Sequence, residues 1–274
     1  MPSHWSLVMF TLLVQSAVGS LWCLQIAHFW HGGRVDPGHL KIQILAAMVL
    51  VLAGLAAAMA HLGKPGASLQ AAKNVKTSWL SREILSVNLF AGLLAVLAVL
   101  AQIRPGAVNA WLLLVASLAG GAVLYAMTRV YRLRTVPAWN HAGTPLAFVG
   151  SALLLGGLLV TLVLQILVLH RGSGQAAMGQ GGLGIESLFA ALMGLVLKIL
   201  AGKVKPCGAM AAWPSKTRQP VLQGAGVGLW MISVLAAGNP VFQALLLFAA
   251  AVCLVTGEIM HRTQFYSSYQ RVGL

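Results

Sequence analysis

Eight long apolar segments recur along this chain, and they constrain its fold more than any other feature of the sequence. Each has close to the roughly 20 residues that an α-helix needs to cross the hydrocarbon core of a bilayer. In lipid the backbone must satisfy its own hydrogen bonds, so segments of this kind form helices. The predicted spans are Trp5–Phe29, Leu40–Ala60, Leu80–Gln102, Val108–Met127, Pro145–Leu169, Ile185–Gly202, Val221–Ala237 and Val241–Met260.

Turn-forming residues separate these spans, among them Gly32-Gly33, Pro105-Gly106 and Gly238-Asn239-Pro240. The last break is so short that the final two helices are expected to form a tight antiparallel hairpin. We therefore predict an all-α fold, a polytopic membrane bundle of eight transmembrane helices with both termini on the same side. Residues 1–274 form a single domain in this prediction, because no polar segment is long enough for a soluble one.

Composition supports this class. The chain is 59% hydrophobic and 8% charged, whereas a soluble domain has roughly 25% charged residues. Cys23, Cys207 and Cys253 show no metal-ligand spacing, so any redox metal is expected in another chain. The segment Met1–Gly19 has no Lys or Arg before its apolar run, and the run continues to Phe29. We therefore interpret it as a retained first helix rather than a cleaved signal peptide.

The 18 Lys and Arg residues are distributed unevenly between the two ends of the predicted helices. Because positively charged loops remain in the cytoplasm, both termini and the second, fourth and sixth loops are predicted to be cytoplasmic, in a bacterial inner membrane. The net charge of +14 fits this topology, and contact with a partner or lipid headgroups, better than nucleic-acid binding. The 14 residues on the N-terminal side are Lys64, Lys73, Lys76, Arg82, Arg129, Arg132, Arg134, Lys198, Lys203, Lys205, Lys216, Arg218, Arg262 and Arg271, and the four on the other side are Arg34, Lys41, Arg104 and Arg171.

His61 and Glu83 are the first candidates for chemistry. His61 closes the second predicted helix and Glu83 lies in the first turn of the third, so both are expected at the cytoplasmic interface. Oxidation of a quinol needs two proton acceptors at such a depth, and a histidine with a carboxylate suits that task. A Glu in a first turn is also favoured by the helix dipole, and an interfacial His commonly meets headgroups. The spacing alone leaves both interpretations open.

Two further groups of ionisable residues have a structural and a functional interpretation. Glu258 lies inside the eighth span, four residues before Arg262, which predicts a helical ion pair. Ionisable groups inside membranes also mark functional sites, so Glu258 is a second pocket candidate. Arg129, Arg132 and Arg134 at the end of the fourth helix predict interfacial anchoring, a docking surface or donors to a quinone carbonyl.

The remaining carboxylate at a helix start, Glu186, is interpreted as a partner of the helix dipole. The histidines also test a haem hypothesis, because a b-type haem needs two axial histidines buried at matching depth. All eight histidines fall near helix ends or in loops, and His28 or His31 with His170 is the pair that could serve.

Several segments in matching order resemble a known family, the membrane-anchor subunits of DMSO-reductase-type molybdoenzymes. These are HWSLVMFTLLVQ near the N-terminus, HLGKP at His61–Pro65, SREI at Ser81–Ile84, RVYRLRTVPAWNHAGTP at Arg129–Pro145 and GEIMHRTQFY at Gly257–Tyr266. The resemblance is weaker over the fifth to seventh spans. The combination of HLGxP, the Ser-x-Glu pair and TVPxW carries the resemblance.

The resemblance implies an anchor of eight helices with no haem or metal of its own. Such anchors hold an iron–sulfur electron-transfer subunit and a molybdopterin catalytic subunit at the membrane, and they exchange electrons with menaquinone or ubiquinone. The family's quinol-site histidine and glutamate match His61 and Glu83, which favours the functional interpretation of that pair. Its glutamate and arginine near the end of the last helix match Glu258 and Arg262. The expected quinone-binding residues are therefore His61, Glu83, Arg129 and Glu258.

The sequence predicts a quinone-reactive anchor of a heterotrimeric molybdoenzyme. Its substrate is chosen in another chain, and both sulfite oxidation and S- or N-oxide reduction use anchors of this type. Some relatives carry their positive charge on the odd-numbered loops, whereas this chain loads the even ones, so we take the orientation from this sequence and expect the partners on the cytoplasmic face. A secondary transporter of small solutes is the alternative, although transporters usually place charged groups near the bilayer midplane.

Overall fold

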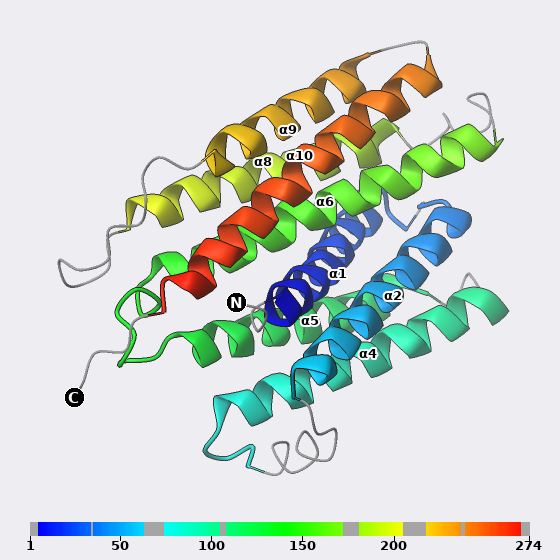
Figure 1. The fold of residues 1–274 in the computed structure, drawn as a ribbon. Coiled ribbons are helices and arrows are strands. Elements are labelled where there is room, and N and C mark those ends of the chain that lie inside the picture. Colours follow the sequence, from blue (N-terminus) through cyan, green and yellow to red (C-terminus); the bar gives the residue numbers. More distant parts are fainter. Residues whose placement is uncertain are drawn as a thin grey trace.

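A computed structural model of the chain describes residues 5–33, 35–62, 74–104, 108–171, 181–204, 218–236 and 239–269, without the side chains of residues 61, 62, 171, 181 and 182. Within these ranges the chain forms eight helices and no strand (Figure 1), which confirms the predicted all-α class. The helices are α1 (Trp5–Trp30), α2 (Pro37–Leu62), α4 (Trp79–Ile103), α5 (Ala110–Tyr131), α6 (Gly143–Arg171), α8 (Gly181–Lys203), α9 (Gln219–Leu235) and α10 (Pro240–Ser267).

Seven of the helices in the described part of the chain are long and apolar enough to cross a membrane. The eighth, α9, is apolar and has 17 residues. At 1.5 Å per residue it is about 26 Å long, which lies at the lower limit for a membrane span. The chain is therefore a multi-pass helical membrane protein.

The last helix departs most from its predicted bounds. It was expected to end at Met260, and α10 continues to Ser267. Its final turns are too polar to extend an apolar run, but they are amphipathic: Glu258, Arg262 and Phe265 are buried while Thr263 and Ser267 are exposed. Burial at this helical spacing continues the helix where hydropathy alone predicts an end.

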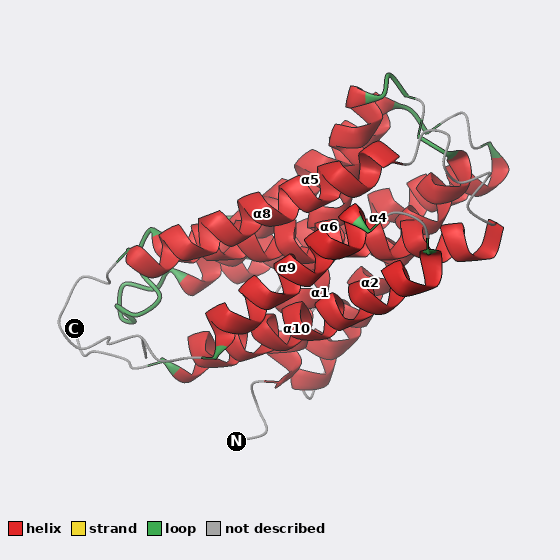
Figure 2. Ribbon diagram, turned by 90° about the horizontal axis from the view of Figure 1, so that it is seen from above, coloured by secondary structure: helices red, strands yellow, loops and turns green. Residues whose placement is uncertain are grey.

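The eight helices form two four-helix units. In the N-terminal half α1 packs against α2 and α5, and α4 packs against α2 and α5. In the C-terminal half α6 packs against α8 and α10, and α9 packs against α8 and α10. Figure 1 shows α8, α9 and α10 on one side of α6, with α2 and α4 on the other, and the turned view of Figure 2 shows the same long helices from above. The contact of α1 with α6 joins the two halves.

Successive helices run in opposite directions, so their connections alternate between two ends of the bundle (Figure 1). One end, here called the basic end, contains the start of α1, the end of α10 and the helix termini flanking the second, fourth and sixth connections. Among the helices that the structure describes, the first therefore begins and the last ends at the basic end (Figure 1). Described basic residues at this end include Lys76, Arg82, Arg129, Arg134, Lys203 and Arg218.

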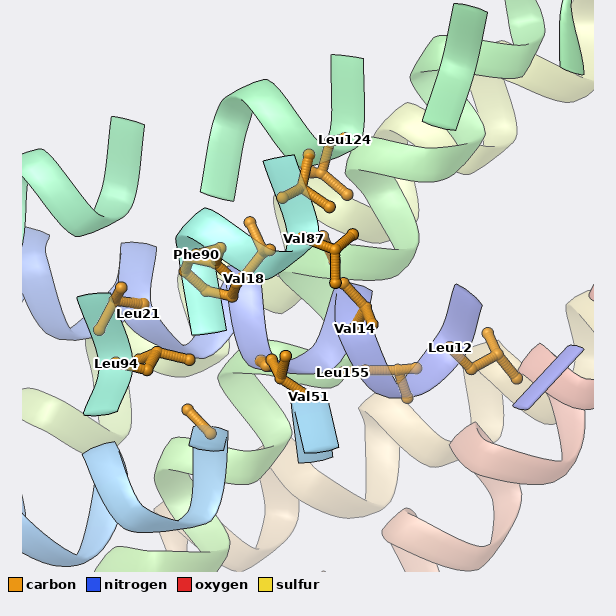
Figure 3. Packing of buried hydrophobic residues seen from close by; sticks show 14 of the residues in the cluster. Leu12, Val14, Val18, Leu21, Val51, Val87, Phe90, Leu94, Leu124 and Leu155 are labelled. Carbon is orange, nitrogen blue, oxygen red and sulfur yellow. The ribbon is translucent and has the colours of Figure 1, made fainter. Parts of the chain in front are cut away.

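The core of the N-terminal half is apolar and is centred on α1. Figure 3 shows side chains from four other helices converging on that helix, which is buried along most of its length. The labelled residues are Leu12, Val14, Val18 and Leu21 of α1, Val51 of α2, Val87, Phe90 and Leu94 of α4, Leu124 of α5 and Leu155 of α6.

Glycines allow the close approach of α6 to its two main neighbours. A Cβ atom on Gly19 of α1 would lie 1.7 Å from the backbone oxygen of Ala152, and one on Gly156 would lie 2.2 Å from the carbonyl carbon of Gly19. Between α6 and α8, a Cβ on Gly150 would lie 2.7 Å from the Gly194 oxygen. Any larger residue would force the backbones apart, as expected where small residues form helix contacts in membranes.

Candidate functional site

Glu83 is a buried carboxyl group close to the basic end. Helix α4 begins at Trp79, after Ser78 caps it by accepting a hydrogen bond from the Ser81 N–H at 3.3 Å. Glu83 therefore lies at the beginning of the second turn, and it is 4% exposed. Its Oε1 atom has no hydrogen-bond partner among the residues that the structure describes. A buried carboxyl oxygen without a partner is costly, which is the state expected of a group that awaits a ligand or a proton.

His61 lies in the last turn of α2, and its side chain is outside the described residues. Helices α2 and α4 pack against each other. The end of α2 and the start of α4 both belong to the basic end (Figure 1). The fold thus places the backbone of His61 at the same end of the bundle as Glu83, on a neighbouring helix.

Arg129 lies in the last turn of α5, where its exposed guanidinium stacks on an aromatic ring. The guanidinium carbon is 4.7 Å from the ring centre of Trp79, the first residue of α4. The Arg82 guanidinium carbon is 4.2 Å from the same indole. The structure therefore brings Arg129 to the helix that carries Glu83, one turn before that residue.

Glu258 lies well inside the C-terminal half, nine residues before the end of α10. Both of its oxygens are satisfied: Oε1 accepts from the Gln223 amide at 2.7 Å and lies 2.8 Å from Lys198 Nζ. Oε2 accepts from the Ser151 hydroxyl at 2.7 Å and from Lys198 Nζ at 3.0 Å. Lys198 Nζ also lies 3.3 Å from His261 Nδ1. This buried charge cluster joins α6, α8, α9 and α10.

The predicted pairing of Glu258 with Arg262 one turn later is wrong, because the salt bridge goes to Lys198 of α8. Arg262 instead donates to the side-chain oxygen of Gln15 on α1 at 2.6 Å, and its guanidinium carbon lies 4.1 Å from the ring centre of Phe148. Arg262 is fully buried, and this contact links the cluster to the N-terminal half.

Lys198 and Arg262 also change the charge count. Both were counted among the loop residues that set the orientation, but they are buried at 7% and 0% exposure and belong to the core. Without these two, the count that carries the orientation is 12 against 4. The asymmetry is large enough that the orientation inferred from it does not change.

An aromatic cluster lies at the basic end, beside the connection between α5 and α6. It consists of Tyr131, Trp139, Phe265 and Tyr266. Trp139 of that connection stacks on Phe265 of α10 with ring centres 5.1 Å apart, and its indole N–H donates to the Phe265 carbonyl at 2.7 Å. Tyr131, at the end of α5, accepts a hydrogen bond from the Tyr266 hydroxyl at 3.0 Å. Glu83 lies close enough to both tyrosines to interact with them electrostatically. The TVPAWN motif therefore ties the two halves together beside Glu83.

His141 in the same connection is held neutral. Its Nδ1 accepts from the Gly143 N–H at 3.0 Å, and its Nε2 lies 3.0 Å from the Ala138 carbonyl, which needs a hydrogen there. Burial lowers the pKa of this imidazole and the nearby Arg132 charge lowers it further, whereas the Ala138 carbonyl raises it. The net direction is down, in agreement with a neutral ring protonated on Nε2.

The opposite end of the bundle holds a different pair. Glu186, predicted to act as a dipole partner of its helix, lies 3.0 Å from His31 Nε2 and so bridges α8 to the residue that follows α1. His28 is buried and His170 is exposed. The histidines proposed for a haem therefore have unlike surroundings, and one of them already faces a carboxylate.

The sequence did not single out the groups that surround Glu258. By sequence alone Lys198 counts as a loop charge, and no pattern marks Ser151, Gln223 or Gln15 as its neighbours. One signal was present: Lys198 is a lone cation inside an apolar run, LMGLVLKILAG, and a cation at such a position needs a buried partner. The sequence has four carboxylate side chains. Among them Glu258, inside the eighth predicted span, is the natural partner of Lys198.

The fold and the distribution of charge define the class: a multi-pass helical membrane protein whose Lys and Arg residues gather mostly at one end. The family described as DMSO reductase anchor subunit (DmsC) matches residues 1–179, and the chain belongs to this family. It is thus a membrane-anchor subunit, a type that implies catalytic and electron-transfer partner subunits. The matched range contains His61, Glu83 and Arg129.

Individual relatives agree over nearly the whole length. The sequence is 28% identical over 282 residues to the YnfH subunit of an anaerobic dimethyl sulfoxide reductase of Escherichia coli (strain K12), covering 99% of this protein and 96% of that one. It is 27% identical over 285 residues to the C subunit of the anaerobic dimethyl sulfoxide reductase of the same organism, with the same coverage. The corresponding C subunit from Haemophilus influenzae is 29% identical over 163 residues, 58% of each protein. No solved structure gives a significant match.

Proposed function

We propose that this chain anchors a heterotrimeric molybdoenzyme and exchanges electrons with the quinone pool through an iron–sulfur subunit, which in turn serves a molybdopterin catalytic subunit. Membership of the anchor family and the length of the match to its relatives support this assignment. The observation that carries the quinone reaction is Glu83, a carboxyl group at 4% exposure with an oxygen left without a partner among the described residues.

In the proposed site His61 and Glu83 accept the two protons that leave a quinol as its electrons pass to the iron–sulfur subunit. A histidine is suited to this work at neutral pH, and a carboxylate held out of water is a stronger base than a solvated one. The two groups lie near the end where protons can reach water. Arg129, on the neighbouring helix α5, supplies a donor toward the quinone head at the mouth of the site.

Glu258 is proposed to act on the quinone site indirectly, without contact with the quinone. Both of its oxygens are occupied by Lys198, Ser151 and Gln223, so a quinone ring could reach it only by displacing one of them. We propose that Glu258 supports quinone binding through Arg262, which interacts electrostatically with both Glu258 and Tyr131, and through Tyr131, which interacts in the same way with Glu83. Substitution of Glu258 should therefore lower the stability of the protein more than it lowers the rate of quinol turnover in the protein that does fold.

Substitution of the two proton acceptors tests the proposal. Glu83→Gln and His61→Gln keep the size of each side chain, and each should lower quinol-coupled turnover by roughly 10²–10⁴-fold, the usual contribution of an acid–base group. Activity of the same complex with a soluble artificial dye should stay at the wild-type rate, because the partner's centres do not change. Asn88→Ala, an exposed position on α4, is the control and should alter neither activity. Normal quinol turnover in both variants would refute the site.

The partners are proposed to dock at the basic end, on the cytoplasmic face of the bacterial inner membrane, with both termini of this protein on that side. Electrons tunnel only over short distances, so the docked subunit and the quinone site must share a face. The 12-to-4 distribution of basic residues supports the cytoplasmic assignment. Protease treatment of right-side-out and inverted vesicles tests it, and digestion of the partners from the periplasmic side alone would contradict it.

The cytoplasmic face favours sulfite as the substrate of the complex over an S- or N-oxide respired outside the cell, with electrons flowing from sulfite to quinone. The relatives' names refer to reduction of dimethyl sulfoxide by those proteins. Purified complex should reduce a quinone analogue when supplied with sulfite. Oxidation of a quinol analogue with dimethyl sulfoxide, and no reaction with sulfite, would reverse the assignment. A protein that purifies from native membranes without iron–sulfur or molybdenum subunits would instead support a transporter.

A further inference from the structure

The exposed cations of the basic end have no acidic side chain of this protein to pair with. The sequence contains four carboxylate side chains. Asp36, just before α2, and Glu186, in the second turn of α8, lie at the opposite end. Glu83 and Glu258 are buried at 4% and 0% exposure. We therefore expect the counter-charges for these cations to come from a partner subunit or from anionic lipid.

One place at this end is organised to hold such a charge. The guanidinium carbons of Arg82 and Arg129 lie 4.2 and 4.7 Å from the ring centre of Trp79. These distances add to 8.9 Å, which is the largest separation that the two carbons can have. Two like charges repel at this range, and their stacking on one indole offsets only part of that repulsion. An anion that contacts both guanidinium groups at the edge of the indole would offset this repulsion.

Arg82 is held in a fixed position for this role. Its Nε donates to the Val75 carbonyl at 2.8 Å, and one Nη donates to the Lys76 carbonyl at 2.7 Å. A guanidinium has five N–H donors, so up to three remain for an external acceptor. The turn that leads into α4 thus orients the Arg82 side chain, and Lys76 of the same turn is exposed.

The surroundings of the pair belong to the membrane surface. Leu80, next to Trp79, is 49% exposed, and Tyr125, whose ring meets Trp79 edge-on at 5.6 Å, is 57% exposed. Both residues lie on membrane-spanning helices, where exposed apolar side chains face lipid tails. A Trp and a Tyr beside cations are typical of the headgroup level. An acidic protein surface would not need apolar neighbours of this kind.

We propose that Arg82, Arg129 and Trp79 form a binding site for the phosphate of an anionic phospholipid such as phosphatidylglycerol or cardiolipin. Arginines bind phosphate oxygens at about 2.8 Å, so one phosphate can bridge guanidinium carbons roughly 8 Å apart, and a lipid with two phosphates can bridge a wider gap. The acyl chains lie along Leu80 and Tyr125 between α4 and α5. This site does not depend on the quinone reaction, and the lipid would seal the outer side of α4 one turn from Glu83.

The test measures lipid retention in the whole complex, extracted from native membranes in polymer nanodiscs. Phospholipids that co-purify are quantified by mass spectrometry for wild type, for Arg82→Gln/Arg129→Gln, and for the control Arg134→Gln/Arg218→Gln. The control removes the same charge from exposed positions at the same end. We expect the first variant to retain anionic phospholipid roughly tenfold less well, from the loss of charge-assisted hydrogen bonds, and the control to retain it as wild type does. Equal retention in both variants overturns the proposal.

A second arm separates lipid from free phosphate. Delipidated wild-type complex receives either phosphatidylglycerol in mixed micelles or inorganic phosphate at the same phosphate concentration. We expect the lipid to raise the melting temperature by about 2–4 °C and phosphate to have no effect, and an equal shift with phosphate would refute a lipid site. If the double variant does not accumulate, the single variant Arg129→Gln replaces it in the lipid-retention measurement, because Arg82 then keeps its hydrogen bonds to the turn before α4. Arg129 also belongs to the proposed quinone site, so activity is not a readout.

Discussion

The N-terminal half buries one carboxyl group, Glu83, and the C-terminal half buries another, Glu258, but their surroundings differ. Glu258 has a lysine, a serine and a glutamine on its two oxygens. Glu83 has an oxygen with no partner among the described residues and lies beside an otherwise apolar core. A buried charge is tolerated when it is paired and hydrogen-bonded, and it is costly when it is not. The comparison separates a carboxylate that holds helices together from one that is available to a ligand.

The largest expected effect comes from leaving a charge unpaired in the C-terminal half. Glu258→Ala removes the partner of Lys198 and should destabilise the protein by about 3–5 kcal/mol. Little of the variant should accumulate in membranes. The double variant Lys198→Met/Glu258→Gln keeps the volume and removes both charges, so it should recover much of the stability. Thermal unfolding in detergent measures both. If the double variant is no more stable than Glu258→Ala, the unpaired charge of Lys198 is not the cause of the loss, and the ion pair does not link α8 to α10 as described.

The joint between the halves should be the next most sensitive place. Gly156→Ala puts a Cβ 2.2 Å from the backbone of Gly19, and α1 and α6 must separate to admit it, at an expected cost of about 1–3 kcal/mol. Gly228→Ala on α9 is the matched control, because nothing lies within 4 Å of its added Cβ, and it should be neutral or slightly stabilising. Melting temperatures that rank the two variants in the opposite order would contradict the close contact of the halves.

The aromatic cluster ties the halves at the basic end more weakly. Trp139→Phe keeps a ring to stack on Phe265 and removes the hydrogen bond to its carbonyl, at an expected cost of about 0.5–1.5 kcal/mol. Trp111→Phe, at an exposed position on α5, should cost less. Because the cluster adjoins Glu83, quinol turnover measured beside stability shows whether the joint also shapes the proposed site. A stability unchanged by Trp139→Phe would mean that stacking alone holds the connection.

The smallest effect is a pH dependence from His141. Burial lowers the pKa of this group in the folded protein below its ordinary value of 6.5. The unfolded protein therefore takes up the proton first as the pH falls. The stability that the neutral ring contributes is complete above about pH 6.5 and is lost progressively below it. The ring is partly exposed, so solvent screening keeps this dependence small. His141→Gln should flatten the slope of melting temperature between pH 7 and 5, and an unchanged slope would assign it to other groups.

Hydropathy and charge determined the number of helices, the order of their connections and the end at which basic residues gather. Each of these follows from local sequence, because a run of about 20 apolar residues spans the bilayer whatever surrounds it. The same reasoning placed His61 in the last turn of α2, and it placed Glu83 in the first turn of α4, whereas the structure has Glu83 at the beginning of the second turn. It ended α10 too early, because the final turns are buried on one face and polar on the other, and their burial depends on neighbouring helices.

Tertiary structure alone decided which side chains meet. One turn of helix separates Glu258 from Arg262, yet packing gives Glu258 to Lys198 of α8 and turns Arg262 toward Gln15 of α1. It also places two arginines on Trp79, although Arg129 lies 50 residues along the sequence from that indole. The rotation of each helix about its axis and the close contacts at glycines such as Gly19 set these partners. Such contacts arise between segments far apart in the sequence, where periodicity carries no information about distance.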